Sequence, residues 1–358
     1  MIQRELIRGA AAAFDCAVTK AAQARGRRSR PPGASESLTH HERLDGLARL
    51  AAHYEDALAD ATWFREPQLI APRRRAIRGR TTAEIHDLRW ASSFEPLVEA
   101  IAPRYLRQEN NLEAVARVFR HREPRPAVVL IHGYLGGQQA FEEKAWPTRW
   151  LFDELGLDLA FFVLPFHGPR RRKDGPPAFP SSDPRVTVEG FRQAVTDLRD
   201  LIHWLRTTGS PSVGVMGMSL GGYTTALAAT VEPELAFAVP VIPLASIAAF
   251  AREQGRLDPD PHRGRLEEDA LERVHARVSP LQRRLAIDPE RVLVVAAEAD
   301  RITPKRHAER IAEHFEAPLT SFPGGHLLQF GRGQAFRHIG RHLGRLGVTA
   351  PRRSDRTG

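Results

Sequence analysis

One pentapeptide in the sequence has the residue types and the spacing of a catalytic serine turn. Gly217-Met218-Ser219-Leu220-Gly221 follows an apolar stretch at 212–216 and precedes a helix-like stretch at 223–230. A serine between a strand and a helix, with glycine two positions before and two after it, is typical of a nucleophile elbow. Such a turn is so tight that only residues without side chains fit at the two glycine positions. The sequence therefore predicts that Ser219 Oγ is exposed as a nucleophile at the carboxyl end of a parallel strand.

A glycine-rich loop upstream of the serine has the residues to complete a site for an oxyanion. Attack of a serine on a carbonyl needs two N–H donors for the negative oxygen that forms. We expect the Leu220 N–H as one donor, because a helix N-terminus has free N–H groups and a positive dipole end. The second is expected from residues 132–137 (His-Gly-Tyr-Leu-Gly-Gly), which follow a buried strand at 126–131. Tyr134 N–H is the preferred donor and Leu135 N–H the alternative, and a sharp turn without chemistry is the plain alternative for the whole loop.

The acid of the site is expected in the loop after a buried strand at 291–297. Two carboxylates, Glu298 and Asp300, follow this strand. We prefer Asp300, because Thr303 and Pro304 have the residue types of a helix N-cap and first position, which places Asp300 just ahead of the helix. Glu298 stays open as the rival.

The histidine base is expected in the loop after the last strand, at 317–322. A Pro-Gly-Gly-His sequence ends at His326 and is followed by a helix-like stretch at 333–346. The resulting chain order of serine, acid and histidine matches the order known for nucleophile elbows. His326 is preferred because two loops in this order flank the same end of the sheet. Other histidines are interpreted as surface or structural residues, among them His40, His41, His307, His314, His338 and His342.

Four segments at the ends of expected strands resemble the alpha/beta-hydrolase superfamily, in its serine esterase and lipase-like branch: residues 131–134, 217–222, 300–304 and 324–326. The resemblance covers about residues 75–347. It implies the alpha/beta-hydrolase fold of the α/β class, with a mostly parallel eight-stranded sheet flanked by helices. It also implies hydrolysis through a covalent acyl-serine, with no metal or organic cofactor. One departure is Ala297, which ends the acid strand where relatives often carry glycine. Because many activities share this fold, the fold does not settle the substrate.

The expected function is a serine hydrolase that cleaves carboxylic esters, lipid or other acyl esters included, through a Ser219-His326-Asp300 triad. Residues expected to line the substrate site are His132, Gly133, Leu135 and His167. An acyltransferase, a thioesterase or a peptidase with the same triad remains an open alternative. A non-catalytic ligand-binding protein of the same fold is the alternative from another class.

A run of four cations, at residues 170–173, follows the strand expected at 159–165. It has two interpretations: a site for an anionic group of the substrate, or a solvated loop. The solvated loop is the more common use of such a run.

Composition argues for a globular enzyme rather than a nucleic-acid-binding or membrane protein. The apolar fraction of 42% is ample for a core, and Cys16, the only cysteine, excludes an intrachain disulfide and favours a reducing, cytoplasmic compartment. The net charge is +9, but only four of the 52 basic residues are lysines and the arginines are spread along the chain, so no specific nucleic-acid partner is expected. No segment has the length and apolarity of a signal peptide or a transmembrane helix. The expected partner is a small acyl ester.

The chain is expected to divide into three parts. Residues 1–70 are predicted to be a helical extension with a polar linker near 25–40, and its helices are candidates for a homodimer contact. Residues 71–348 are the predicted hydrolase domain, in which a helical insertion at about 245–290 forms a cap over the serine. Residues 349–358 are predicted to be a disordered tail.

Overall fold

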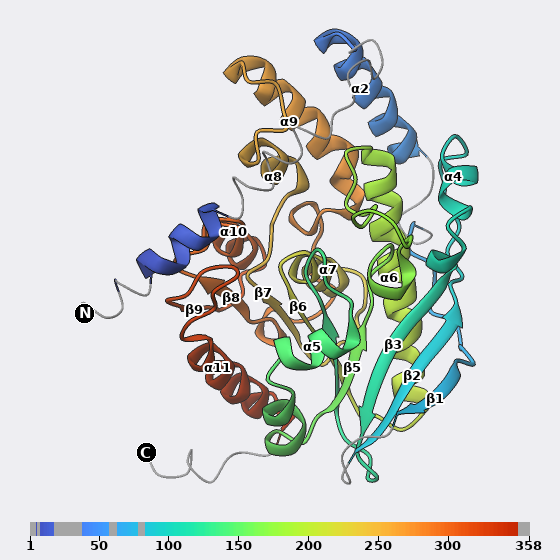
Figure 1. The fold of residues 1–358 in the computed structure, drawn as a ribbon, viewed down its shortest axis with the longest axis vertical. Coiled ribbons are helices and arrows are strands. Elements are labelled where there is room, and N and C mark those ends of the chain that lie inside the picture. The colour runs from blue at the N-terminus through green and yellow to red at the C-terminus, as the bar shows by residue number, and fades with distance from the viewer. Residues whose placement is uncertain (1–4, 6–7, 18–37, 57–62, 78–82, 350–358) are drawn as a thin grey trace.

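The computed structural model describes residues 5, 8–17, 38–56, 63–77 and 83–349. Its strands form a single mixed sheet in the order β1-β2-β3-β5-β4-β6-β7-β8-β9 (Figure 1). Strands β4 to β9 run parallel to one another, whereas β1, β2 and β3 join them through antiparallel pairs. The strands are β1 (Arg73–Ile77), β2 (Glu84–Ala91), β3 (Glu113–Arg120), β4 (Ala127–Ile131), β5 (Asp158–Phe162), β6 (Val213–Met218), β7 (Ala238–Val241), β8 (Val294–Ala297) and β9 (Leu319–Phe322).

Helices cover both faces of this sheet, and the expected α/β fold is confirmed. Besides a helix over residues 8–17, the helices are α2 (His40–Asp56), α4 (Ala102–Leu106), α5 (Gln139–Ala145), α6 (Pro184–Thr207), α7 (Leu220–Ala229), α8 (Ile247–Glu253), α9 (Pro261–His275), α10 (Arg306–His314) and α11 (Arg332–Arg345). Short helical turns are η1 (Glu109–Leu112), η2 (Trp150–Glu154), η3 (Gly168–Arg170), η4 (Ala276–Val278), η5 (Pro280–Gln282) and η6 (Pro289–Arg291).

The core lies in two layers, one on each face of the sheet. In β4, Val129 and Ile131 face the layer that α6, α7, α9 and α10 cover, whereas Val128 and Leu130 face the layer that η2 and α11 cover. Alternation of side chains along a strand produces this division. Because both faces are buried, the strand reads as a continuous apolar run, as expected of a central parallel strand.

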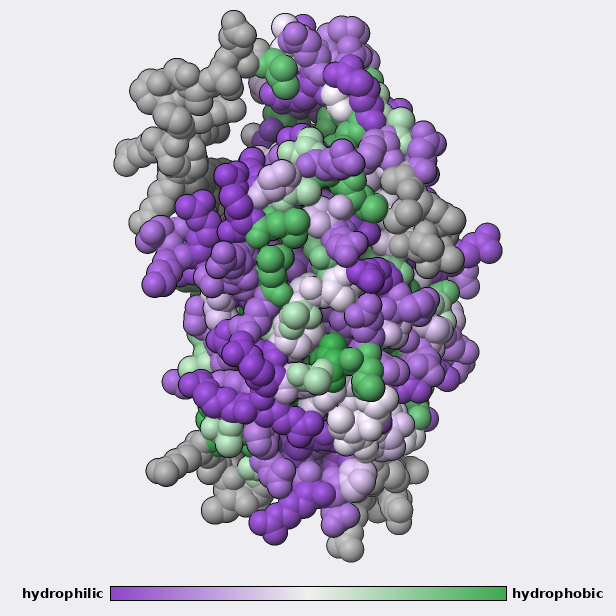
Figure 2. All heavy atoms as spheres, turned by 90° about the vertical axis from the view of Figure 1, so that its right-hand side faces the viewer, coloured by the Kyte–Doolittle hydropathy of each residue, from purple (hydrophilic) through white to green (hydrophobic). Residues whose placement is uncertain are grey.

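The described sheet has nine strands, one more than the eight that the resemblance predicts. The additional strand is β1, an edge strand that pairs with β2. Its sequence begins with three exposed arginines, Arg73, Arg74 and Arg75, which gives no apolar alternation to identify a strand. Charged residues of this kind blunt a sheet edge against pairing with another chain. Figure 2 shows the side of the molecule that carries this edge: hydrophilic side chains cover most of it, and hydrophobic ones form separate patches.

The N-terminal part packs against its own chain in two places. Helix α2 contacts α9, which belongs with α8 to the insertion expected at 245–290 (Figure 1). The helix over residues 8–17 contacts the loops that follow β8 and β9. Most of the expected linker, residues 25–37, and nearly all of the expected tail, residues 350–358, lie outside the described residues, and a homodimer contact through these helices stays a prediction. Over the described ranges, no helix combines the length and the apolarity needed to span a bilayer.

Candidate active site

Ser219 lies in a strained turn between β6 and α7. Its backbone has φ 57° and ψ −112°, a conformation that costs a residue with a side chain of the order of 1–3 kcal/mol. Hydrogen bonds hold it from both sides: the Ser219 N–H donates to Val241 O, and the Tyr223 N–H donates to Ser219 O, each at 3.0 Å. The serine side chain is partly exposed, whereas the residues on either side of it are buried. The turn thus presents Ser219 at the carboxyl end of a parallel strand.

The two glycines of the pentapeptide are required by close backbone contacts. A Cβ at Gly217 would lie 2.1 Å from Gly221 O, and a Cβ at Gly221 would lie 2.2 Å from Ile131 O. Both distances are far below van der Waals contact, so neither position accepts even alanine without a shift of the backbone. Helix α7 can start this close to β4 and β6 only because these side chains are missing.

The glycine-rich loop lies directly against the serine. A Cβ at Gly133 would be 3.4 Å from Ser219 Cβ. Residues 133–136 of the loop form a turn closed by a 3.1 Å hydrogen bond from the Gly136 N–H to Gly133 O. Leu135, the third residue of this turn, has φ 69°. Among the described residues, neither the Tyr134 N–H nor the Leu220 N–H donates to a protein acceptor. Both expected oxyanion donors are thus without a protein acceptor among these residues, and their role stays a prediction.

The side chain of His132, the first residue of the glycine-rich loop, holds the rest of the loop in place. The Leu164 N–H donates to His132 Nε2 at 3.0 Å, so Nδ1 carries the proton and donates to Gly133 O at 2.7 Å. Burial lowers the pKa of His132 to about 4, which keeps the ring neutral. Since both ring nitrogens are engaged within the protein, this geometry fits a role in holding the loop and leaves no ring nitrogen for the substrate.

His167 is buried beside the same loop. Its Nδ1 donates to Pro165 O at 2.8 Å, and burial, with His132 close by, lowers the pKa of His167 to about 3. Its Nε2 has no hydrogen-bond partner among the described residues. The Tyr134 ring lies edge-on at 5.9 Å between centroids, and a Cβ at Gly168 would lie 2.1 Å from Gly137 O. The His167 loop is therefore packed tightly under the glycine-rich loop.

The run of four cations does not act as one patch. Arg170 is completely buried and forms a 2.7 Å ion pair with Asp197, which is also completely buried. It donates to Val163 O and Asn111 O as well. Of the rest of the run, Arg171 is partly exposed, and Arg172 and Lys173 are exposed. The interpretation as a wholly solvated loop is therefore wrong for Arg170, because its guanidinium holds η3 to η1, to the residue after β5 and to α6.

The acid and the histidine of the expected triad are in contact. His326 Nδ1 lies 2.7 Å from Asp300 Oδ2, while Asp300 Oδ1 accepts from the Ile302 and Thr303 N–H groups at 2.8 and 2.7 Å. With Nδ1 donating to the carboxylate, Nε2 is the nitrogen left to act as a base. Burial works to lower the pKa of His326, but the Asp300 and Asp15 carboxylates outweigh it and raise that pKa above its ordinary value. Glu298, the rival acid, accepts instead from Ser321 Oγ at 3.1 Å.

Thr303 has a different place from the one expected. Helix α10 begins at Arg306, with Lys305 as its N-cap, so Thr303 is not the cap. Its Oγ lies 3.0 Å from Asp300 Oδ2 and 3.0 Å from His326 Nδ1. The hydroxyl thus joins the acid and the base, because the loop continues for two more residues before the helix starts.

The loop of His326 lies beside the elbow and is tied to the acid loop. The Gln329 amide approaches Met218 Sδ at 3.9 Å, one residue before Ser219. The Ala299 N–H donates to Gly324 O at 3.0 Å. The structure therefore gathers the serine turn, the acid loop and the histidine loop at one edge of the sheet.

Asp15 contacts this site and was not expected from the sequence. Its carboxylate is buried and accepts the N–H groups of His326 at 2.7 Å, Leu327 at 3.1 Å and Arg301 at 3.2 Å. No local pattern indicates this contact, since Asp15 lies some 300 residues earlier in the chain. In the sequence it reads only as a charge that interrupts an apolar stretch.

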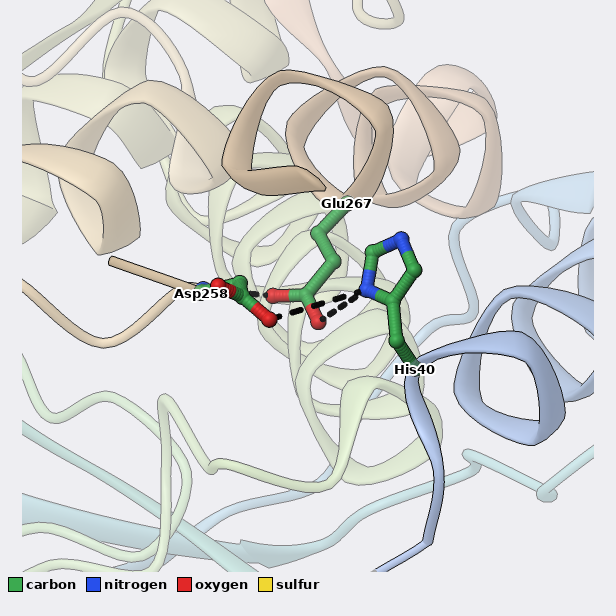
Figure 3. Close-up of side chains that lie close together, drawn as sticks. All are labelled: His40, Asp258 and Glu267. Atoms are coloured by element: carbon green, nitrogen blue, oxygen red, sulfur yellow. Dashed lines mark hydrogen bonds and ion pairs between the residues drawn. The ribbon is translucent and has the colours of Figure 1, made fainter. Parts of the chain in front are cut away.

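One cluster of side chains has the donor types of a metal site. The ring of His40 and the carboxylates of Asp258 and Glu267 lie within 4.8 Å of one another, where α2 meets the α8–α9 insertion (Figure 3). The Arg43 guanidinium already donates to Glu267 Oε1 at 3.0 Å, and the Asp258 N–H donates to Glu267 Oε2 at 2.9 Å. We therefore interpret the cluster as an ion-pair network that joins α2 to the insertion.

Sequence relatives match the centre of this chain. The model of the family described as "Alpha/beta hydrolase domain containing 18" matches residues 186–258, which hold α6, the elbow, α7 and α8. Two uncharacterized proteins from strains of Mycobacterium tuberculosis, Rv2627c and MT2702, are each 35% identical to this chain over 230 residues. That alignment covers 62% of this chain and 55% of each relative, so this chain spans about half the length of the curated relatives it matches.

Solved structures match nearly the whole fold at low sequence identity. Acetyl xylan esterase 1 from Thermoanaerobacterium sp. JW/SL YS485 is 15% identical, with a TM-score of 0.53, over 87% of this chain and 99% of that one. An acetyl xylan esterase from Paenibacillus sp. R4 is also 15% identical, with a TM-score of 0.54, over 87% and 96%. At such identity the likeness speaks for the fold. Its sheet topology agrees with that likeness, so the chain has the alpha/beta-hydrolase fold.

Proposed function

We propose that this protein is a serine hydrolase that cleaves carboxylic esters through an acyl-serine intermediate. The observation that carries the proposal is the strained, partly exposed Ser219 at the same sheet edge as a His326–Asp300 pair joined at 2.7 Å. Strain of this kind persists only where the surroundings impose it, and it is concentrated at functional sites. The esterases among the structural relatives support the reaction class only as an analogy of fold.

In the proposed reaction, His326 Nε2 takes the proton of Ser219 as Oγ attacks the ester carbonyl. Asp300 holds the imidazole through Nδ1 and stabilises its cation, and the raised pKa of His326 favours that proton transfer. The N–H groups of Leu220 and Tyr134 bind the oxyanion. The alcohol then leaves with the proton from His326, and a water activated by the same ring cleaves the acyl-serine.

The two histidines near the oxyanion loop have supporting roles in this proposal. His132 stays neutral and fixes the Gly133 carbonyl, which orients the following N–H groups. His167 is fully buried, packs edge-on against the Tyr134 ring and supports the loop from within. Gly133 and Leu135 would line the substrate through the loop backbone.

The proposal is tested with p-nitrophenyl esters from acetate to palmitate. We expect hydrolysis by the wild-type protein and a loss of at least about 10⁴-fold in kcat for Ser219→Ala and for His326→Ala. The ester series reports the acyl length that the site accepts. Transfer of the acyl group to an added alcohol in preference to water would indicate an acyltransferase, and unchanged rates in both variants would refute the proposal.

A further inference from the structure

The helix over residues 8–17 lies across the two loops that supply the proposed acid and base. Figure 1 shows it, in dark blue, on the side of the molecule that carries β8 and β9. The carboxylate of Asp15 is fully buried beneath it. One oxygen, Oδ2, accepts the His326 and Arg301 N–H groups, and the other, Oδ1, accepts the Leu327 N–H. Arg301 directly follows Asp300, so a single carboxylate holds the backbone of both loops.

The histidine loop is shaped to receive this helix. A Cβ at Gly325 would lie 2.7 Å from Asp15 Oδ2 and 3.2 Å from Ala11 Cβ. Glycine at this position therefore lets the helix come close enough for its carboxylate to reach the His326 N–H. Arg8, about two turns earlier on the same face of the helix, lies 3.8 Å from Glu298 in the acid loop. The helix and the two loops are therefore complementary both in hydrogen bonding and in shape.

We propose that Asp15 is a positioning residue for the catalytic histidine, which it holds through the backbone of two loops at once. This inference rests on the proposed serine-hydrolase function. Hydrogen bonds from N–H groups to a carboxylate are about twice as strong as neutral ones, so two of them hold the histidine loop firmly and the third holds the acid loop. A displacement of about 1 Å in a catalytic group can cost about 100-fold in rate.

The charge of Asp15 also acts on the imidazole. The charged groups that face His326 are Asp300, on the loop after β8, and Asp15, on the N-terminal helix, and both raise the pKa of His326. Removing the Asp15 charge should therefore lower that pKa. Because the base must be neutral to react, the acid limb of the kcat/KM profile should then move to lower pH.

Three variants separate positioning from folding. Asp15→Ala removes the acceptor and the charge, Asp15→Asn removes the charge but keeps one acceptor oxygen, and Arg8→Ala is the matched control on the same helix. We expect kcat/KM for a p-nitrophenyl ester to fall about 100-fold in Asp15→Ala and about tenfold in Asp15→Asn, and to stay within twofold in Arg8→Ala. The acid limb should move to lower pH in both Asp15 variants.

Two readouts do not depend on ester hydrolysis. Hydrogen exchange of the peptide spanning residues 323–330 should be faster in Asp15→Ala than in wild type and Arg8→Ala. The His326 ring resonance should titrate at lower pH in both Asp15 variants. Wild-type exchange together with an unmoved titration, in a folded Asp15→Ala protein, would overturn the inference. If these two changes occur but the wild type hydrolyses no ester, the anchoring stands and the proposed function fails.

Discussion

Replacing Arg170 with methionine tests whether the buried ion pair holds the layer beneath the oxyanion loop. Arg170 and Asp197 are both fully buried, 2.7 Å apart, and Ser92 Oγ donates to the second oxygen of Asp197 at 2.6 Å. Removing one partner of such a pair leaves a buried charge without compensation, at a cost of about 3–5 kcal/mol. For a chain of 358 residues this corresponds to a fall in Tm of about 4–7 °C.

The loss of unfolding free energy in Arg170→Met should increase as the pH rises. Burial raises the pKa of Asp197, and Arg170 opposes that rise. Without Arg170 the folded-state pKa lies further above the unfolded one. The penalty is therefore smallest below the unfolded pKa of Asp197 and grows as the pH rises toward the folded pKa. Urea unfolding of wild type and variant at several pH values measures this difference in the free energy of unfolding.

Two further variants control the test. Arg172→Met removes an exposed cation of the same run and should change the free energy of unfolding by less than about 0.5 kcal/mol. The double variant Arg170→Met/Asp197→Leu removes both charges and should be more stable than Arg170→Met alone, because no unpaired charge remains. A double variant whose loss in the free energy of unfolding equals the sum of the losses in Arg170→Met and Asp197→Leu would show that the two charges do not interact. An Arg170→Met protein within 1 kcal/mol of wild type would contradict the predicted loss.

Three other outcomes follow from the contacts of the site and the insertion. Thr303→Val should lower kcat/KM about tenfold in steady-state ester hydrolysis, because its hydroxyl joins the acid to the base, and an unchanged rate would contradict that role. Gly221→Ala should lose at least about 3 kcal/mol in thermal or urea unfolding, because its Cβ would lie 2.2 Å from Ile131 O, whereas Gly333→Ala, at an open helix position, should be neutral or stabilising. Glu267→Ala should lower the free energy of unfolding by about 2–3 kcal/mol, because it leaves its partners on α2 and a backbone N–H unpaired; a smaller loss than in an exposed-residue control would contradict the network.

The parts of the fold that the sequence predicted well are those with local patterns. Buried parallel strands read as apolar runs, and the elbow reads as two glycines around a serine, because the backbone contacts at Gly217 and Gly221 exclude every other residue. The expectation of eight strands missed β1, because its first three residues are exposed arginines and show no apolar alternation. Its pairing with β2 comes from the tertiary fold and leaves no alternation in the chain.

The supporting residues of the site could not be predicted from local patterns. Asp15 and Arg170 are charged, and a charge in isolation is read as exposed, since almost no charged residue is fully buried unless it is paired. Their partners, the His326 N–H and the Asp197 carboxylate, lie 311 and 27 residues away in the sequence. Only the folded structure shows that backbone N–H groups bind the buried Asp15 carboxylate and that the Asp197 carboxylate pairs with the buried Arg170.

Intact-mass detection of a fluorophosphonate adduct reports whether Ser219 is an activated nucleophile. The purified wild type is labelled beside Ser219→Ala and His326→Ala, and each variant is checked for folding by thermal unfolding. We expect a single adduct on the wild type, none on Ser219→Ala, and greatly slowed labelling of His326→Ala, because an activated serine needs its base. A folded wild-type protein that stays unlabelled, or an adduct that persists in Ser219→Ala, would contradict the proposed role of Ser219.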